Sequence, residues 1–319
     1  MSLDFVSIVI PAHNEERYLS QCLTSLFDQG YPSDKYEIIL VNNNSTDRTQ
    51  KIAESFKINI IEQKIGPVGA VRNAGAVRAQ GSILAFIDAD CVAPDDWLFS
   101  GSQLLKKPNC VYGGGADLKP SPHWIENAWL LENKLPPKEL LGCCIFIKKT
   151  DFIDIGGFDE TITSGEDTKL SVSLRERDFD VKMTDSLNVI HLGNPTTIKY
   201  FFIRQIWHSE NYLQNWVDTK RDPTFYLLLL FLVSVTAVCF NFLLNKPDLA
   251  MIFLTIALTV PMIFTIKRLR RSKNMLKNLR NFIPIYSLDF LYLLGRSVGL
   301  GKSILKRLSI ISLGGRSEG

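Results

Sequence analysis

The sequence contains little cysteine, and its cysteines are scattered. The six cysteines among 319 residues form neither CxxC pairs nor the spacing of a small disulfide-stapled domain, so we expect reduced thiols. An excess of charge is also missing: the net charge is only +3, and we expect no nucleic-acid partner. With 46% apolar residues, the chain has enough material for one large core or two modest ones.

The N-terminus lacks the features of a secretory signal. No charged region precedes its apolar run, which Pro11 interrupts after a few residues. We therefore expect this end to stay in the cytosol. Acidic residues are missing from one segment, 267–280, which carries seven lysines and arginines.

Short apolar runs alternate with helical patterns through the first hundred residues. Strands are predicted at 5–10, 36–41, 58–61 and 82–87. Helices are predicted at 19–27, after a cap at Ser45 or Thr46, and from Pro67 to Gln80. Strands that are apolar on both faces and separated by single helices indicate an α/β fold with a parallel sheet covered on both sides.

Polar clusters follow three of these strands, at 13–15, 42–47 and 88–90. Ligands of parallel sheets bind beyond the carboxyl ends of the strands, so these clusters predict a ligand site. Asp88 and Asp90 are two apart after an apolar strand, and we expect their side chains on the same face. Two neighbouring carboxylates favour a divalent cation, Mg²⁺ or Mn²⁺, bridging a diphosphate. A solvated turn is the alternative.

The C-terminal third contains two long apolar runs. Residues 224–244 carry no charge and are long enough to span a bilayer, and 249–266 form a shorter candidate. We expect a transmembrane hairpin at 224–266, after an α/β domain at 1–200 and an amphipathic connector at 201–223. Basic residues on both sides place its outer ends in the cytosol, at the inner or plasma membrane. A buried hairpin of a soluble protein is the alternative.

Residues 267–319 are expected to form a basic segment and an interfacial helix. Between 283 and 300, Asp289 and Arg296 interrupt an otherwise apolar pattern. Such a helix lies on a membrane more readily than it crosses one. The basic residues also indicate an anionic membrane surface as a partner.

Five ordered blocks resemble one known family. They are SIVIPAHNEERYLSQCLTSL, LVNNNSTDRT, GPVGAVRNAGAVRAQGSILAFIDADC, GGFDE and GEDTKL, and they span nearly all of residues 5–175. In this order they are similar to the family-two inverting glycosyltransferases of the GT-A fold. The resemblance implies a Rossmann-like, metal-dependent nucleotide-diphospho-sugar transferase domain. Residues 1–100 would bind the nucleotide sugar, a UDP-sugar by default, and residues 101–200 would hold the acceptor.

The resemblance also implies a set of donor-binding residues. They are Pro11, Ala12, Glu15, Asn42, Asn44, Asp47, Arg72, Asp88 and Ala89. Asp88 would bind the ribose, and Asp90 would bind the metal ion on the diphosphate, with Asp88 as a second metal ligand. Arg72 would face the donor phosphates or base. The structural alternatives are a strand terminator at position 11, helix-start charges at 15 and 47, and an exposed helical cation at 72.

Asn42 departs from the family pattern. The family usually has an acidic residue there, which commonly contacts the nucleobase. A carboxamide both donates and accepts hydrogen bonds, whereas a carboxylate only accepts them. The base preference therefore stays open, with uridine only as the default.

Asp167 is the expected catalytic base, with Glu166 beside it, just before a helical pattern. The alternative is that Asp167 only caps the helix. Gly157 and Phe158 would belong to a tight turn that presents the acceptor pocket. The metal and Arg72 would stabilise the leaving nucleoside diphosphate while Asp167 activates the acceptor, and a single displacement inverts the anomeric centre.

Trp207 lies where processive synthases carry a QxxRW motif, which this chain does not match. It would either stack on the acceptor or anchor a helix at the membrane interface. His191 and His208 have no partner at metal spacing, so core or surface roles are expected.

These observations favour a non-processive transferase acting on a lipid-linked or saccharide acceptor near the membrane, in cell-envelope or polysaccharide biosynthesis. A polyprenyl-phosphate monosaccharide transferase is the alternative among enzymes. A catalytically silent membrane scaffold is the alternative of another class.

Overall fold

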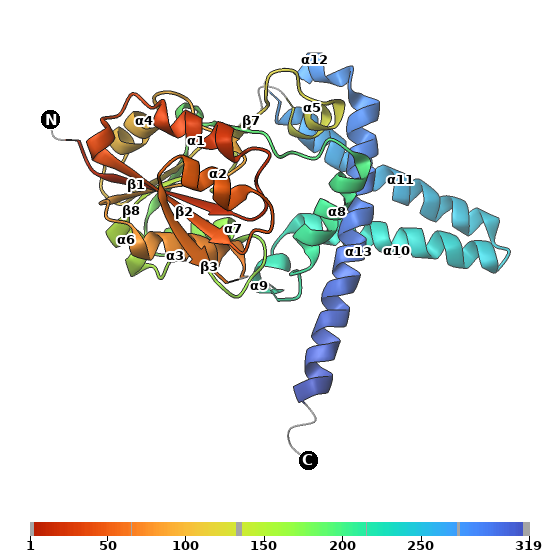
Figure 1. Ribbon diagram of the computed structural model, residues 1–319. Coiled ribbons are helices and arrows are strands. Elements are labelled where there is room, and N and C mark those ends of the chain that lie inside the picture. The colour runs from red at the N-terminus through yellow and green to blue at the C-terminus, as the bar shows by residue number, and fades with distance from the viewer. Residues whose placement is uncertain (1–2, 65, 132–135, 215, 273–274, 315–319) are drawn as a thin grey trace. The chain divides into compact units, whose positions relative to one another are not determined.

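The computed structural model describes residues 3–64, 66–131, 136–214, 216–272 and 275–314 (Figure 1). The chain forms two compact units. We call Met1–Pro120 with Pro136–Asn194 the sheet unit, and Ser121–Leu135 with Pro195–Gly319 the helical unit. Residues 121–135, expected in the acceptor half, thus group with the C-terminal helices. All six cysteines are free thiols, as predicted.

The sheet unit is built on a seven-stranded sheet in the order β3-β2-β1-β4-β8-β6-β9. Its strands are β1 Val6–Ala12, β2 Tyr36–Asn43, β3 Asn59–Gln63, β4 Ile83–Ile87, β6 Cys110–Gly113, β8 Cys144–Lys148 and β9 Asp180–Met183. The four strands predicted from the sequence are present, and β3, β2, β1 and β4 run parallel. β8 runs antiparallel to β4 and β6, so the second half completes the sheet but makes it mixed.

Helices cover both faces of this sheet (Figure 1). They are α1 Leu19–Phe27, α2 Thr49–Ser55, α3 Val68–Arg78, α4 Trp97–Leu104, α6 Lys149–Asp154 and α7 Glu166–Arg175. Side chains of α1, α2 and α4 share one hydrophobic core with inward-facing β1 residues such as Ile8 and Ile10. Those of α3, α6 and α7 share the other with Val9 and Val41. The predicted two-sided covering is therefore confirmed.

A second, three-stranded sheet has the order β5-β10-β7. Its strands are β5 Cys91–Val92, β7 Ala116–Asp117 and β10 Val189–His191. β10 is antiparallel to β5 and parallel to β7. The small sheet therefore brings residues near 190 directly beside the segment that follows β4.

The helical unit contains two long apolar helices, α10 Pro223–Leu243 and α11 Pro247–Arg270, which pack against each other as a hairpin. Its other helices are α5 Trp124–Leu130, α8 Ile198–Ser209, α9 Trp216–Thr219, α12 Met275–Leu279 and α13 Phe282–Gly314. Both α10 and α11 are long and apolar enough to cross a membrane. Only 22% and 33% of their most apolar stretches is buried, unlike the core of a soluble protein. The hairpin is compatible with a membrane anchor.

Asp289 of α13 is held among helices. Asp289 is fully buried and accepts hydrogen bonds from Arg268 Nη2 at 2.7 Å and from Thr265 Oγ1 at 2.9 Å. The Arg268 guanidinium lies 3.8 Å from the ring centroid of Trp129. Asp289 therefore interrupts the apolar pattern because it pairs inside the protein, and the interfacial position of α13 stays a prediction.

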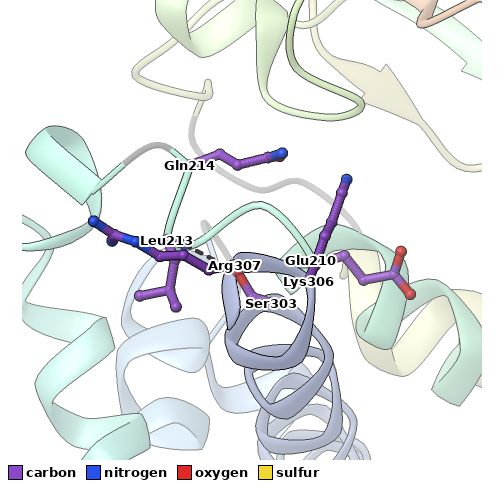
Figure 2. Close-up of a pocket in the computed structure, with 6 residues that line it drawn as sticks. All are labelled: Glu210, Leu213, Gln214, Ser303, Lys306 and Arg307. Atoms are coloured by element: carbon purple, nitrogen blue, oxygen red, sulfur yellow. Dashed lines mark hydrogen bonds between the residues drawn. The ribbon is translucent and has the colours of Figure 1, made fainter. Parts of the chain in front are cut away.

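A cavity of about 270 Å³ lies between α13 and the segment after α8 (Figure 2). It is lined by Glu210, Leu213, Gln214, Ser303, Lys306 and Arg307. The backbone N–H of Leu213 donates to Ser303 Oγ at 3.1 Å, which ties the loop to α13. None of the expected site residues lines this cavity.

Candidate active site

Two loops at the carboxyl edge of the sheet are tied together by short polar side chains. The N–H of Asn14 donates to Ser45 Oγ at 3.0 Å, and Asn14 Oδ1 accepts from the N–H of Thr46 at 2.8 Å. Asn14 has a φ of 59°, which Asn tolerates better than most residues. The prediction that Ser45 or Thr46 caps a helix is wrong, because both bind the neighbouring loop and α2 begins at Thr49.

Asp47 is engaged in the same network. Its Oδ2 accepts from the N–H of Glu16 at 3.0 Å, and its Oδ1 accepts from the N–H of Thr49 at 2.9 Å. Burial raises the pKa of Asp47, but these hydrogen bonds outweigh it and lower the pKa. This geometry agrees with the alternative in which Asp47 is a favourable negative charge at the start of α2. A contact between Asp47 and the donor stays a prediction.

Asp88 and Asp90 lie in a turn just beyond β4. The strand ends at Ile87, and the N–H of Cys91 donates to the carbonyl of Asp88 at 3.0 Å. The expectation that both carboxylates share one strand face is therefore wrong, since the chain turns before Asp90. Asp88 Oδ1 instead binds Arg72 Nη2 at 2.6 Å, while Asp90 Oδ2 lies 3.6 Å from His191 Nε2.

His191, for which a core or surface role was expected, is a candidate site residue because it lies beside Asp90. The pairing of β10 with β5 sets His191 opposite Cys91, one residue after Asp90. Ligand atoms of Asp90, Cys91 and His191 all lie within 4.8 Å of one another. Among the described residues, His191 Nδ1 is buried without a hydrogen-bond partner. No local motif reports this contact, because the two segments are about a hundred positions apart.

Gly193 lets the backbone pass close to Asp90. A Cβ at this position would lie 2.0 Å from Asp90 Oδ2. The N–H of Leu192 also donates to the carbonyl of Asp90 at 2.8 Å. The segment after β10 therefore fixes the position of Asp90, and a side chain at position 193 would displace its carboxylate.

Negative charge accumulates at this edge. The pKa of Glu15 is raised to about 8 by burial first, and then by the charges of Asp90, Asp88 and Asp47. Carboxylates repel one another in this way when they are close and only partly hydrated. A cation bound at the edge would relieve this repulsion.

Arg72 joins three elements. It projects from α3, is 2% exposed, and donates to Asp88 Oδ1 and Glu166 Oε1, each at 2.6 Å. Its guanidinium lies 5.4 Å from the ring centroid of Phe158. These carboxylates outweigh burial and raise its pKa, so Arg72 is permanently charged. The alternative of an exposed helical cation is wrong, and a contact with the donor stays a prediction.

Asp167 lies in the first turn of α7, beside this arginine. Its Oδ2 accepts from the N–H of Gly142 at 3.0 Å, and its Oδ1 accepts from the N–H of Thr168 at 2.7 Å. Its pKa is raised to about 6, by burial first and then by Glu166, while both N–H groups and Arg72 lower it. A carboxylate with this pKa suits a general base near neutral pH.

Gly142 is a residue that the sequence analysis missed. A Cβ there would lie 2.4 Å from Arg72 Nη2. Its N–H meanwhile binds Asp167. The loop before β8 therefore holds the arginine and the expected base together.

The turn at Gly157 positions Phe158 next to Arg72. Gly157 has a φ of 71°, and Asn73 bonds both the N–H and the carbonyl of Phe158 at 2.9 Å. Phe158 is buried against Phe86 and Phe152. The expected tight turn is present, and its role in presenting the acceptor stays a prediction; the Phe158 ring itself packs in the core, beneath the Arg72 guanidinium.

The remaining expected donor residues lie at the same edge. Pro11 is half-buried, while Ala12 and Ala89 are buried in the core. Asn44 has a φ of 55° in the loop after β2. Trp207 belongs to α8 of the helical unit and is exposed, so its acceptor role stays a prediction.

Asn42 contacts an acidic side chain of the next strand. It is 2% exposed, and its Oδ1 accepts from the N–H of Ser45 at 3.1 Å. Its Nδ2 donates to both carboxylate oxygens of Glu62, at 3.2 and 3.1 Å. The two residues are direct partners in the β2–β3 ladder. A carboxylate is thus present beside the position where the resemblance leads one to expect an acid.

Sequence comparisons agree with this geometry. Residues 7–154 match the model of the Glycosyl transferase family 2. Glycosyltransferase AglE of Haloferax volcanii is 37% identical over 209 residues, which are 61% of this chain and 69% of AglE. Beta-monoglucosyldiacylglycerol synthase of a Nostoc species is 26% identical over 289 residues, 78% of this chain and 59% of the synthase.

A solved structure supports the same fold. The mannosyltransferase PcManGT from Pyrobaculum calidifontis, in complex with GDP-Man and Mn²⁺, covers 94% of this chain, and the match spans 88% of PcManGT. The TM-score is 0.60 at 16% identity. The expected GT-A-like α/β domain with a C-terminal apolar hairpin is therefore confirmed. By its sequence, its fold and the ordered residues at the carboxyl edge of its sheet, this chain belongs to glycosyl transferase family 2.

Proposed function

We propose that the protein transfers a sugar from a nucleoside-diphosphate sugar to a lipid-linked or saccharide acceptor in envelope glycan synthesis, with inversion at the anomeric carbon. The observation that carries this is a cluster of acidic residues at the carboxyl edge of the sheet: Arg72 binds Asp88 and Glu166 beside Asp167, and the charges of Asp88 and Asp90 act on Glu15. The names of the relatives, Beta-monoglucosyldiacylglycerol synthase among them, support an acceptor at a membrane.

A divalent cation fits the Asp90 side of this edge. The carboxylate of Asp90 and Nε2 of His191, 3.6 Å from its Oδ2, would supply one oxygen and one nitrogen ligand. Mn²⁺ accepts such a mixed set more readily than Mg²⁺ does. When bound, it would neutralise charge on the departing diphosphate. The Mn²⁺ in the PcManGT complex supports this assignment.

Asp167 would remove the proton of the acceptor hydroxyl. Its carboxylate is held by the N–H groups of Gly142 and Thr168. Arg72 fixes Glu166, the neighbouring residue, and so keeps the start of α7 beside the turn that carries Asp88. One base on one side of the sugar suffices for a single displacement with inversion.

The hairpin of α10 and α11 would anchor the enzyme, with the sheet unit on the cytoplasmic side. Lysines and arginines at the C-terminal end of α11 support this orientation. Anchoring raises the effective concentration of a membrane-bound acceptor.

The proposal is tested by supplying the purified full-length protein with a panel of nucleotide sugars and following release of the nucleoside diphosphate. We expect release that requires Mn²⁺ or Mg²⁺ and stops with a chelator. Extraction of labelled product into organic solvent after addition of polyprenyl phosphate distinguishes a monosaccharide-lipid product. The silent scaffold would be favoured by two results together. No sugar nucleotide would be turned over, and Asp90→Asn would bind nucleotides as tightly as the unmodified protein does.

Gly193→Ala is expected to weaken Mn²⁺ binding about 10- to 100-fold, because the added methyl group would displace the Asp90 carboxylate. Calorimetric titration with Mn²⁺ measures the effect. Gly301→Ala is the matched control, since a Cβ there meets no atom within 4 Å. Equal Mn²⁺ affinities in the two variants would show that Asp90 does not hold the cation.

A further inference from the structure

The cavity between α13 and the segment after α8 lies within the helical unit (Figure 2). Its loop residue Leu213 is bonded to Ser303 of α13. The neighbouring Tyr212 packs its ring against that of Phe225, with the centroids 5.6 Å apart. Phe225 belongs to the first turn of α10. The cavity is therefore near the end of the hairpin at which α10 begins.

The charges that line the cavity favour an anion. Lys306 and Arg307 are exposed cations of α13, and Glu210 is the only acid among the six lining residues. Glu210 also accepts a hydrogen bond from Lys302 Nζ at 2.8 Å, which compensates its charge. With Lys302 included, three cations accompany one carboxylate. An anion that enters the cavity is therefore attracted by an excess of positive charge.

Ser303 supplies a buried hydroxyl at the same place. It is 3% exposed, and its oxygen accepts the N–H of Leu213 at 3.1 Å. Among the described residues, its O–H donates to no acceptor, whereas the hydroxyl of Ser297 on the same helix donates to the carbonyl of Leu293 at 2.9 Å. Leaving a buried donor without an acceptor costs free energy. A phosphate oxygen in the cavity would be such an acceptor.

The surface beside the cavity indicates a lipid as the source of the phosphate. Leu213 lines the cavity itself, and Ile304, Leu305 and Leu308 of α13 are exposed. Apolar side chains that alternate with basic ones along an exposed helix are typical of the headgroup region of a membrane. The volume of about 270 Å³ lies just below the usual range of ligand pockets, so it suits a headgroup without its acyl chains.

We propose that this cavity binds the phosphate group of an anionic membrane lipid. Arg307 and Lys306 pair with its charge, and Ser303 donates to one of its oxygens. The acyl chains then extend along the exposed apolar side chains of α13, and the lipid holds this helix at the membrane surface. The inference rests on the anchoring by α10 and α11 within the proposed function, and it does not depend on the transfer of a sugar.

Native mass spectrometry of the full-length protein in a neutral detergent tests the proposal, because it resolves each bound lipid by its mass. We expect phosphatidylglycerol to bind at least about tenfold more tightly than phosphatidylcholine, whose headgroup carries a compensating positive charge. Arg307→Gln and Ser303→Ala should each lower the affinity for phosphatidylglycerol by about tenfold, the effect of losing one charge-assisted hydrogen bond. Arg78→Gln, at an exposed arginine of α3, and Ser297→Ala are the matched controls and should leave this affinity unchanged.

A free phosphate as the ligand is tested with glycerol phosphate. If it displaces phosphatidylglycerol at equal concentration, the cavity recognises a soluble phosphate ester and the assignment to a lipid is wrong. Equal affinities for the two lipids, or an Arg307→Gln variant that binds phosphatidylglycerol as Arg78→Gln does, would also overturn the inference.

Flotation with phosphatidylcholine vesicles measures the anchoring separately. Protein that floats without a preference for phosphatidylglycerol leaves the proposed function standing and overturns only the lipid site. Protein that does not float overturns the anchoring as well.

Discussion

Asp167→Asn is expected to lower the rate of sugar transfer by a factor of about 10² to 10⁴, the usual contribution of a general base. The amide keeps the size of the side chain, and its oxygen can still accept the N–H of Gly142. It cannot take a proton from the acceptor hydroxyl. Steady-state transfer with saturating donor measures the loss, and the affinity for the nucleoside diphosphate should hardly change.

The pH dependence gives this prediction a second readout. The pKa of Asp167 is raised to about 6 by burial and by Glu166, so the basic form prevails only above that pH. We expect kcat/KM to rise about tenfold per unit of pH below about 6 and to level off above it, because only the deprotonated carboxylate acts as a base. Asp167→Asn should abolish this acidic limb.

The helix-capping alternative makes the opposite prediction. If Asp167 only satisfied N–H groups at the start of α7, Asp167→Asn would keep most of the transfer rate and the acidic limb. Asp178→Asn serves as the matched control. It changes an exposed aspartate just after the same helix, at a positive φ that asparagine also tolerates.

Arg72→Ala is expected to lower the free energy of unfolding by about 3–5 kcal/mol, the usual cost of removing one partner of a buried ion pair. Asp88 and Glu166 would lose their shared counter-charge, and Glu166 is itself buried. Denaturant unfolding of the full-length protein, followed by circular dichroism, measures the change. Transfer activity should fall with it, because the turn after β4 and the start of α7 lose their common partner.

Two further variants define the reason for the loss. Arg78→Ala removes an exposed arginine near the end of the same helix and should change stability by less than about 0.5 kcal/mol. Arg72→Lys keeps the charge but loses the two-armed geometry, so an intermediate loss is expected. Equal stabilities of Arg72→Ala and Arg78→Ala would show that the bridge contributes little to the fold.

The local features of the sheet unit were predictable. The strands β1 to β4 lie within a few residues of the predicted runs, because apolar residues on both faces of a strand leave a continuous pattern in the sequence. The carboxyl-edge position of His13, Asn42 and Asp88 follows from the same alternation, since parallel strands separated by helices all end on one side. The two apolar helices of the hairpin were also predictable from length and composition.

Two expectations were wrong for identifiable reasons. Ser45 or Thr46 was expected to cap α2, but both bind Asn14 from a neighbouring loop. Asp90 was expected on the face of Asp88, but the chain turns after Ile87. In both places a hydrogen bond from another segment, or a turn just beyond the strand, outweighs the local preference.

The sequence by itself determined the alternation of strands and helices, the edge at which the acidic residues gather, and the apolar hairpin. Only the tertiary structure decided which of these residues meet: His191 with Asp90, Arg72 with both Asp88 and Glu166, and Glu62 with Asn42. The physical reason is that hydrophobic periodicity reports the solvent exposure of each segment. Pairing between distant segments depends instead on strand order and register, which no local pattern records.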